Sequence, residues 1–350
     1  MALIKPERLQ RGDSVAIVSL SSGMLGDKKF IHKYRIAKDR LENDFGLRVF
    51  PMENALKGSE YLDAHPEARA KDLMDAFSDR TIKAVFNAIG GDDAIRLLPY
   101  VDFDVLRCNP KIFTGFSDTT TIHFMMRRAG LVSYYGLSVM NNIAEYVRIN
   151  EYTLNAMMKT LFSPAPRLEI PASGFCSYED DKIWWSEENM NNATPRFDAA
   201  GYELIQGAQA GKTVSGELLG GCVEVFIDLM GTSLWPTLDD WRGKLLLIET
   251  SEWNINPELL TSVLRNLAAQ GIFSVINAIV FGRPAYREKY EAYKEVFRRV
   301  VGFEAGRSEL PILSNVNVGH AYPIGVFPLG LRYELDCERV ALTLAEPAVL

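Results

Sequence analysis

The stretch KIFTGFSDTTTIHFMMRR, residues 111–128, joins a short apolar run to a segment with helical character. Residues 111–116 have the length and apolar content of a buried strand, and residues 119–128 have those of a helix. Strand-like runs at 14–20, 47–52, 84–89 and 131–135 alternate with helical patterns at 28–45, 66–77 and 93–100. Because parallel strands are normally joined by crossover helices, this alternation predicts a parallel sheet with helices on its faces.

The alternation stops between residues 164 and 212, a stretch with several prolines, asparagines and glycines and no clear period. We expect a connecting or substrate loop there, since long ordered loops in enzymes often form lids or binding loops. Further on, strands are expected at 214–219, 244–248 and 276–281, helices at 223–230, 257–270 and 286–301, and antiparallel strands at 326–344.

These patterns predict an α/β protein of two domains, the number that 350 residues normally require. Residues 1–163 are expected to form a parallel-sheet, flavodoxin-like domain. Residues 213–350 are expected to form a second, mixed α/β domain.

The composition excludes several classes of function. A net charge of −7 without a basic stripe argues against a nucleic-acid polymer as partner and favours a small-molecule or peptide substrate. No signal peptide or membrane-spanning segment is recognisable, so a cytoplasmic location is expected. The cysteines are scattered and predict neither a zinc site nor disulfides. They are Cys108, Cys176, Cys222 and Cys337.

No cofactor motif is complete in the sequence. Residues 207–213, GAQAGKT, resemble a phosphate-binding loop but have only three residues between the glycines and no helix after them. The segment GGDD at 90–93 does not amount to a dinucleotide fingerprint. We therefore expect no cofactor.

Ser117 lies where the strand at 111–116 turns into the next helix. The carboxyl edge of a parallel sheet is where α/β proteins place their chemistry. The free N–H groups at the start of a helix can also stabilise an oxyanion. The simpler alternative is that Ser-Asp caps the helix, a structural role worth about 1 kcal/mol. The second glycine of the usual hydrolase motif G-x-S-x-G is missing.

A nucleophilic serine needs a base and a carboxylate that orients it. His320 lies in VGHAYPIG, a loop rich in glycine and proline that could present an imidazole to a cleft, although an ordinary surface histidine is the alternative. Glu249 ends the apolar run at 244–249, where a charge at a chain reversal is the alternative. His123 follows Ser117 by six residues and should point to another face.

Two adjacent tryptophans, Trp184 and Trp185, stand out in the otherwise polar loop at 164–212. Either they fill the seam between the domains, or one of them stacks on the substrate.

Seven short blocks in the same order resemble the LD-carboxypeptidase and microcin C immunity family of serine peptidases. The blocks are RGDSVAIV at 11–18, RAKDLMDAF at 69–77, AIGGDDAIRLLP at 88–99, GFSDT at 115–119, GELLGG at 216–221, LIE at 247–249 and GHAYP at 319–323. The resemblance extends over nearly the whole chain. The segments IGGDD and YYGLSVM are closer to the microcin-immunity branch than to the murein-recycling branch.

The resemblance implies Ser117 as nucleophile, His320 as general base and Glu249 as the orienting carboxylate. It implies an oxyanion hole from the backbone N–H groups of Gly91 and Asp118. It also implies a site between two domains, no metal and a homodimer. Members of the microcin-immunity branch are thought to stack a nucleobase on an aromatic residue of the loop that here holds the tryptophans.

Three positions depart from the family pattern. Leu20 and Leu137 replace usual prolines, and Cys222 replaces a usual asparagine. The last two put the choice of substrate in doubt. The expected activity is hydrolysis of an aminoacyl or peptidyl amide in a nucleotide conjugate. The alternatives are a carboxypeptidase for murein tetrapeptides and a non-catalytic protein that binds a small ligand.

Overall fold

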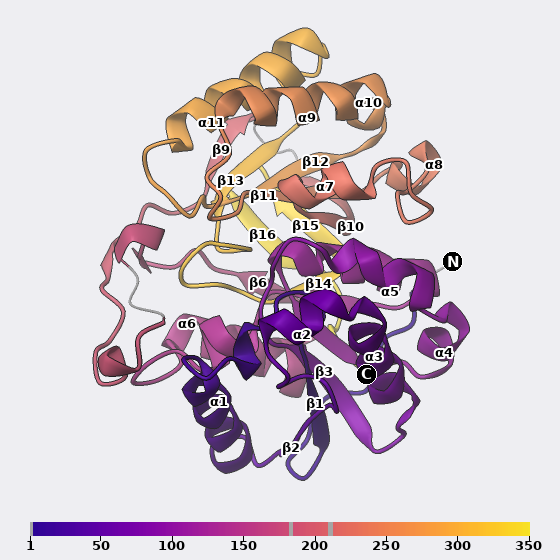
Figure 1. Ribbon diagram of the computed structural model, residues 1–350. Helices are drawn as coiled ribbons and strands as arrows, with labels where there is room; N and C mark the ends of the chain where they lie inside the picture. Colours follow the sequence, from indigo (N-terminus) through magenta and orange to yellow (C-terminus); the bar gives the residue numbers. More distant parts are fainter. Residues whose placement is uncertain (1–2, 182–184, 209–212) are drawn as a thin grey trace.

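The computed structural model describes residues 3–181, 185–208 and 213–350. Its framework is a six-stranded sheet, mostly from the N-terminal half, and an eight-stranded sheet, mostly from the C-terminal half. In Figure 1 the first half (indigo and purple) lies below the second (orange), and the yellow C-terminal strands lie between them. The predicted α/β fold with a second, mixed domain is confirmed.

The six-stranded sheet has the order β14-β5-β4-β3-β1-β2. Its strands are β1 (Ser14–Val18), β2 (Arg48–Pro51), β3 (Ile82–Asn87), β4 (Ile112–Gly115), β5 (Ser133–Tyr135) and β14 (Phe327–Leu329). The first five are parallel, as predicted, and their residues are largely buried, because helices cover both faces of such a sheet. The main helices are α1 (Ile31–Asn43), α3 (Pro66–Ser78), α4 (Phe103–Cys108) and α5 (Thr120–Ala129).

One predicted helix of this half has a different form. The segment expected to be helical at 93–100 is the 3-10 helix η2 (Ala94–Tyr100). It contains Pro99, which has no N–H group for an α-helical hydrogen bond, and a short segment then favours the tighter 3-10 turn.

The eight-stranded sheet has the order β6-β16-β15-β10-β11-β12-β13-β9. Its parallel centre consists of β10 (Thr213–Cys222), β11 (Leu245–Glu249), β12 (Ala278–Gly282) and β13 (Ile312–Val316). The strands β15 (Arg332–Asp336) and β16 (Ala341–Leu344) extend it in antiparallel fashion. The helices α7 (Val223–Leu229), α9 (Pro257–Ala269) and α11 (Tyr290–Phe297) belong to this half.

The segment at 164–212 is more than the loop predicted from the sequence. It supplies both edges of the eight-stranded sheet, β6 (Leu168–Ile170) and β9 (Glu203–Gln206). It also contains the short hairpin of β7 (Phe175–Cys176) and β8 (Phe197–Asp198). Strands of two to four residues are held by backbone pairing with a neighbour, so they leave little periodicity in the sequence.

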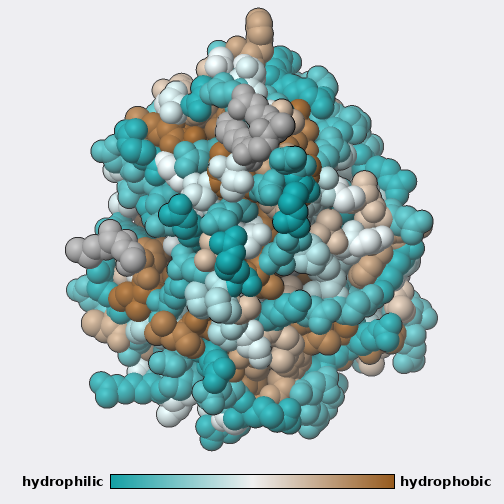
Figure 2. Space-filling view, turned by 180° about the vertical axis from the view of Figure 1, so that it is seen from behind, coloured by the Kyte–Doolittle hydropathy of each residue, from teal (hydrophilic) through white to brown (hydrophobic). Residues whose placement is uncertain are grey.

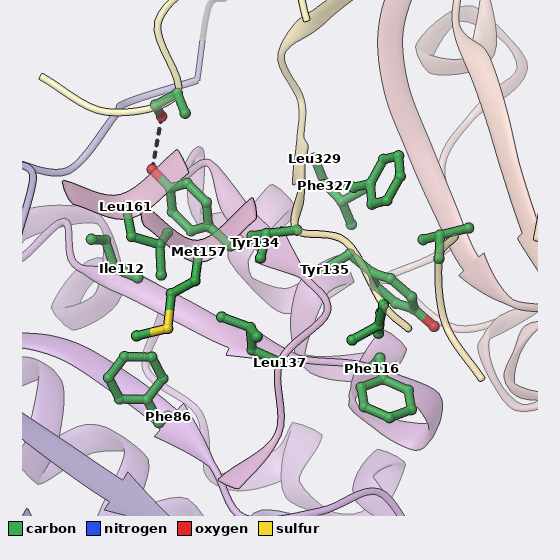
Figure 3. Packing of buried hydrophobic residues seen from close by; sticks show 14 of the residues in the cluster. Phe86, Ile112, Phe116, Tyr134, Tyr135, Leu137, Met157, Leu161, Phe327 and Leu329 are labelled. Carbon is green, nitrogen blue, oxygen red and sulfur yellow. Dashed lines mark hydrogen bonds between the residues drawn. The ribbon is translucent and has the colours of Figure 1, made fainter. Parts of the chain in front are cut away.

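The C-terminal segment connects the two sheets. The expected antiparallel strands form, but β14 leaves the second sheet and pairs with β5, with Phe327 opposite Tyr135. Phe327 and Leu329 are buried beside Tyr134 and Tyr135, and the Tyr134 hydroxyl donates to the Ala348 carbonyl at 2.9 Å (Figure 3). The loop between β13 and β14 therefore passes from one sheet to the other, and it carries His320.

The outer surface is that of an ordinary globular protein. Hydrophilic residues cover most of the face seen from behind, and hydrophobic residues form separate small patches there (Figure 2). Among the described residues, none of the helices has the length and apolar character needed to cross a bilayer.

Candidate active site

Ser117 lies at a sharp turn between β4 and α5. Its φ is 65°, a left-handed conformation that costs a residue with a side chain about 1–3 kcal/mol. The surroundings hold the turn in place. The Ser117 N–H donates to the Tyr135 hydroxyl at 3.2 Å, and the Thr119 hydroxyl donates to the Phe116 carbonyl at 2.6 Å. The Ser117 hydroxyl does not cap the helix, because the N-cap positions are Phe116 and Thr119, neither with a side-chain cap bond. The capping alternative is therefore wrong.

A glycine turn after β3 packs against this serine. A Cβ atom at Gly90 would lie 2.6 Å from Cβ and 2.8 Å from Oγ of Ser117, so only glycine fits there. The Asp118 carboxylate stabilises the glycine turn through hydrogen bonds. Its Oδ2 accepts from the backbone N–H groups of Asp93 at 3.0 Å and Ala94 at 2.8 Å, and from the Ser21 hydroxyl. Burial raises the pKa of Asp118 to about 6.

This packing brings the turn of Gly91 next to the Ser117–Asp118 segment, and Gly91 and Ser117 line the same cavity. The backbone N–H groups of Gly91 and Asp118 remain the predicted oxyanion donors.

Glu249 is the last residue of β11 and is fully buried. Its Oε1 accepts from the Tyr135 hydroxyl at 2.6 Å, and its Oε2 lies 2.7 Å from Nδ1 of His320. The backbone of Gly319, with φ of 68°, passes so close that an added Cβ would lie 2.2 Å from the Glu249 carboxyl carbon. The ends of β5 and β11 and the loop of His320 therefore hold this carboxylate in place.

His320 is buried, and its ring meets the ring of Phe116 edge-on at 5.1 Å. Nδ1 lies on Glu249, and Nε2 lies 2.9 Å from Oε2 of Glu252. Burial lowers the pKa of His320, but the two carboxylates outweigh it and raise that pKa well above 6.5. In the described part of the chain, Ser117 and His320 share no hydrogen bond, and Nε2 of His320 is in contact with Glu252.

The structure therefore brings together the three residues singled out from the sequence, and it adds two more. Tyr135, at the end of β5, reaches Glu249, the backbone N–H of Ser117 and, at 3.2 Å, the Thr120 hydroxyl. Its signal was its place at the end of a predicted strand of the same sheet. Glu252 was not foreseen, although it follows Glu249 by three residues.

A cavity of about 390 Å³ opens in front of Ser117 and His320. Trp185 lines it and also meets the ring of Phe30 edge-on at 5.8 Å. This tryptophan therefore lies both against the N-terminal half and at the cavity. Its neighbour Trp184 lies outside the described residues.

His123 belongs to the core. Its ring bonds Ser133 at 2.8 Å and the Gly115 carbonyl at 2.9 Å, and burial lowers its pKa to about 4. Of the positions that depart from the family pattern, Leu20 and Leu137 are buried hydrophobic residues. They do not line the cavity in front of Ser117.

Cys222 lies close to the site. Its Sγ and one ligand atom each of Glu249 and His320 lie within 4.8 Å of one another, a spacing that could hold a metal ion. However, Glu249 and His320 already bond each other, and the Cys222 thiol donates to Glu224. Burial raises the pKa of Cys222 well above its ordinary value, and a protonated thiol is a poor metal ligand. These residues fit an acid–base pair better than a metal site.

The chain is similar to several known proteins. A probable murein peptide carboxypeptidase of Bacillus subtilis is 28% identical, and the match covers 95% of this chain and 91% of the relative. The microcin C7 self-immunity protein MccF of Escherichia coli is 25% identical, and the match covers 79% of this chain and 78% of MccF. An MccF-like protein from Streptococcus pneumoniae, whose crystal structure was solved in complex with AMP, is 34% identical. The two structures match with a TM-score of 0.86 over 95% of this chain and 98% of the other.

The same relationship appears at the level of the domains. Residues 15–136 match the LD-carboxypeptidase N-terminal domain, and residues 215–335 match the LD-carboxypeptidase C-terminal domain. The chain belongs to the LD-carboxypeptidase family of serine peptidases.

Proposed function

We propose that this peptidase hydrolyses the amide bond between an aminoacyl group and a nucleotide, with Ser117 as nucleophile, His320 as base and Glu249 as the carboxylate that orients it. The observation that carries the proposal is the buried 2.7 Å contact between Glu249 and Nδ1 of His320, at the wall of the cavity that contains Ser117. This contact fixes the tautomer that leaves Nε2 for the serine proton.

The reaction then runs as an acyl transfer. Ser117 Oγ bonds to the carbonyl carbon while its proton passes to Nε2 of His320, and the backbone N–H groups of Gly91 and Asp118 hold the oxyanion. The carbon–nitrogen bond breaks as His320 returns the proton to the leaving amine. Water, activated by the same imidazole, releases the acyl group and restores the serine. Before the first step, Glu252 has to leave Nε2, and Nε2 has to lose the proton that it donates to this carboxylate.

The nucleotide part of the proposal rests on Trp185. Its ring lies at the cavity, where it can stack on a base, and the MccF-like protein from S. pneumoniae was solved with AMP bound. A murein tetrapeptide is the second candidate, because a relative that matches this chain over 91% of its length is named a probable murein peptide carboxypeptidase.

A hydrolysis panel tests the proposal. The enzyme should release adenosine phosphoramidate, the amine that leaves when the carbon–nitrogen bond breaks, from its aminoacyl amide, and it should leave an L,D-linked tetrapeptide nearly untouched. Because the mechanism uses no metal, the rate should survive dialysis against EDTA. Preferential cleavage of the tetrapeptide would establish the second candidate, and activity that EDTA removes and zinc restores would replace the serine mechanism.

Replacing Trp185 with alanine should raise KM for the nucleotide conjugate by about 5- to 150-fold, because stacking a base on an aromatic ring contributes about 1–3 kcal/mol. A conjugate without a base should be cleaved as before. Trp185→Phe is the matched control and should recover most of the affinity. If Trp185→Ala impairs the cleavage of both substrates equally and lowers the melting temperature, Trp185 only holds its loop against Phe30.

A further inference from the structure

Arg69, on α3, is a buried charge that the proposed reaction does not use. Its guanidinium donates to both carboxylate oxygens of Asp93, from Nη1 at 2.6 Å and from Nη2 at 2.8 Å. Nη1 also donates to the Ser21 carbonyl at 3.0 Å. The buried Nε–H of Arg69 has no hydrogen-bond partner among the described residues. Because a buried N–H without a partner lowers stability, packing alone does not account for an arginine at this position.

The two residues that Arg69 joins lie on either side of Gly91. Ser21 packs directly on this glycine, since a Cβ atom added to Gly91 would lie 2.3 Å from the Ser21 Oγ. The next residue, Ser22, donates its backbone N–H to the Gly90 carbonyl at 3.0 Å. Asp93 follows Gly91 by two residues in the sequence. The guanidinium therefore links the segment that packs on the glycine turn to the end of the turn itself.

The Asp118 carboxylate bonds the same two residues a second time. Its Oδ2 accepts from the Ser21 hydroxyl and, at 3.0 Å, from the Asp93 N–H. Arg69, Ser21, Asp118 and Asp93 thus form a closed ring of hydrogen bonds beside Gly91. Glycine has more backbone freedom than any other residue, so contacts of this kind are what keeps the Gly91 N–H in one direction.

We infer that Arg69 is a positioning residue of the oxyanion hole, and that it holds the Gly91 N–H in place through Ser21 and Asp93. This inference rests on the proposed function. Donors stabilise an oxyanion best when they are fixed before the reaction, and removing one such donor lowers kcat by about 10²–10³-fold. Loosening a donor without removing it should have a smaller effect, and we expect a loss of about tenfold or more.

Arg69→Met tests the inference on the alanyl amide of adenosine phosphoramidate. Methionine is apolar and flexible, so it suits a buried position, but it donates no hydrogen bond. Asp93 keeps a cationic partner in this variant, because Nη1 of Arg96 lies 2.7 Å from its Oδ2. We expect kcat to fall about tenfold or more and KM to change less than about threefold, because the lost stabilisation belongs to the transition state.

Arg96→Met is the matched control. Arg96 bonds the same Asp93 carboxylate, but its side chain is 41% exposed, and its other carboxylate partner is Asp63 at 3.0 Å. This variant should leave kcat and KM within about twofold of the unmodified enzyme. Equal losses in the two variants would mean that only the pairing of Asp93 matters and that the link to Ser21 does not, which overturns the inference.

A boronic acid separates a positioning role from a merely structural one. The probe is 1-aminoethylboronic acid, which corresponds to the alanyl group and forms a tetrahedral adduct with a nucleophilic serine, as a transition-state analogue does. Its inhibition constant should rise about tenfold or more in Arg69→Met and should stay within about twofold in Arg96→Met. A lower melting temperature with an unchanged kcat and inhibition constant would mean that Arg69 only stabilises the fold, contrary to the inference.

Asp93→Asn gives a second test that does not depend on the folding of Arg69→Met. Asparagine has nearly the same size as aspartate and keeps one oxygen for Arg69, but it cannot form the charged, two-pronged pair. The kcat and the inhibition constant should move in the same directions as in Arg69→Met, by about threefold or more. Unchanged values in Asp93→Asn would overturn the inference and leave the proposed function intact. Unmodified enzyme that neither hydrolyses the alanyl conjugate nor binds the boronic acid would refute the proposed function, and the inference with it.

Discussion

Replacing Ser117 with alanine should lower kcat by about 10⁴-fold or more, and adding His320→Ala should lower it little further, because the members of a catalytic triad act as a unit. Glu249 is best replaced by glutamine. Alanine would leave the buried hydroxyl of Tyr135 and Nδ1 of His320 without their acceptor, which would mix a folding defect with the catalytic one. Glu249→Gln alters the partner of the imidazole, and we expect it to cost up to about 10⁴-fold in kcat.

Kinetic assays of the single and double variants, together with thermal melting, check this expectation. The melting temperature of Ser117→Ala should change little, since the serine hydroxyl accounts for none of the contacts that hold its turn. Losses that multiply in the double variant, or a Ser117→Ala enzyme of nearly full activity, would contradict the assignment of the three residues.

The second large effect is expected for Gly90→Ala, which should lower kcat/KM by about 100-fold, because a misplacement of about 1 Å at a reacting group can cost that much. The added methyl group would lie 2.6 Å from Cβ of Ser117, inside any normal contact distance. Either the serine or the glycine turn must then move, and each carries one part of the proposed machinery.

Gly174→Ala is the matched control, because a methyl group there meets nothing within 4 Å. It should leave kcat/KM and the melting temperature close to those of the unmodified enzyme. A Gly90→Ala enzyme as active as Gly174→Ala would show that the close packing of the turn on Ser117 has no part in catalysis.

The sequence predicts the parallel part of the fold well, because strands such as β4 and helices such as α5 have clear local patterns. It does not predict where β14 pairs, since three residues that complete a sheet edge contain no information about their partner. The edge strands β6 and β9 were missed for a related reason, because their few residues are held by backbone pairing with distant strands.

For the candidate site, the residue pattern indicated Ser117, Glu249 and His320 as catalytic candidates. Each of them also had a simpler structural explanation. The capping alternative for Ser117 fails because the N-cap positions are Phe116 and Thr119, and no local pattern reveals the positive φ of Ser117. The place of Tyr135 at the end of a predicted strand marks it, but its contact with Glu249 joins two sheets and is not visible in the sequence. Glu252 contacts His320 from a different loop, so nothing near it in the sequence marks it. The resemblance to a known family supplied the roles of the triad residues.

The central claim is that Ser117 is the nucleophile, and covalent labelling with an active-site phosphonate tests it most directly. We expect a single adduct, located by peptide mass spectrometry on Ser117, that forms as hydrolysis is lost and is absent from Ser117→Ala. An adduct on another residue such as Cys222, or unimpaired hydrolysis by enzyme labelled at Ser117, would contradict the claim.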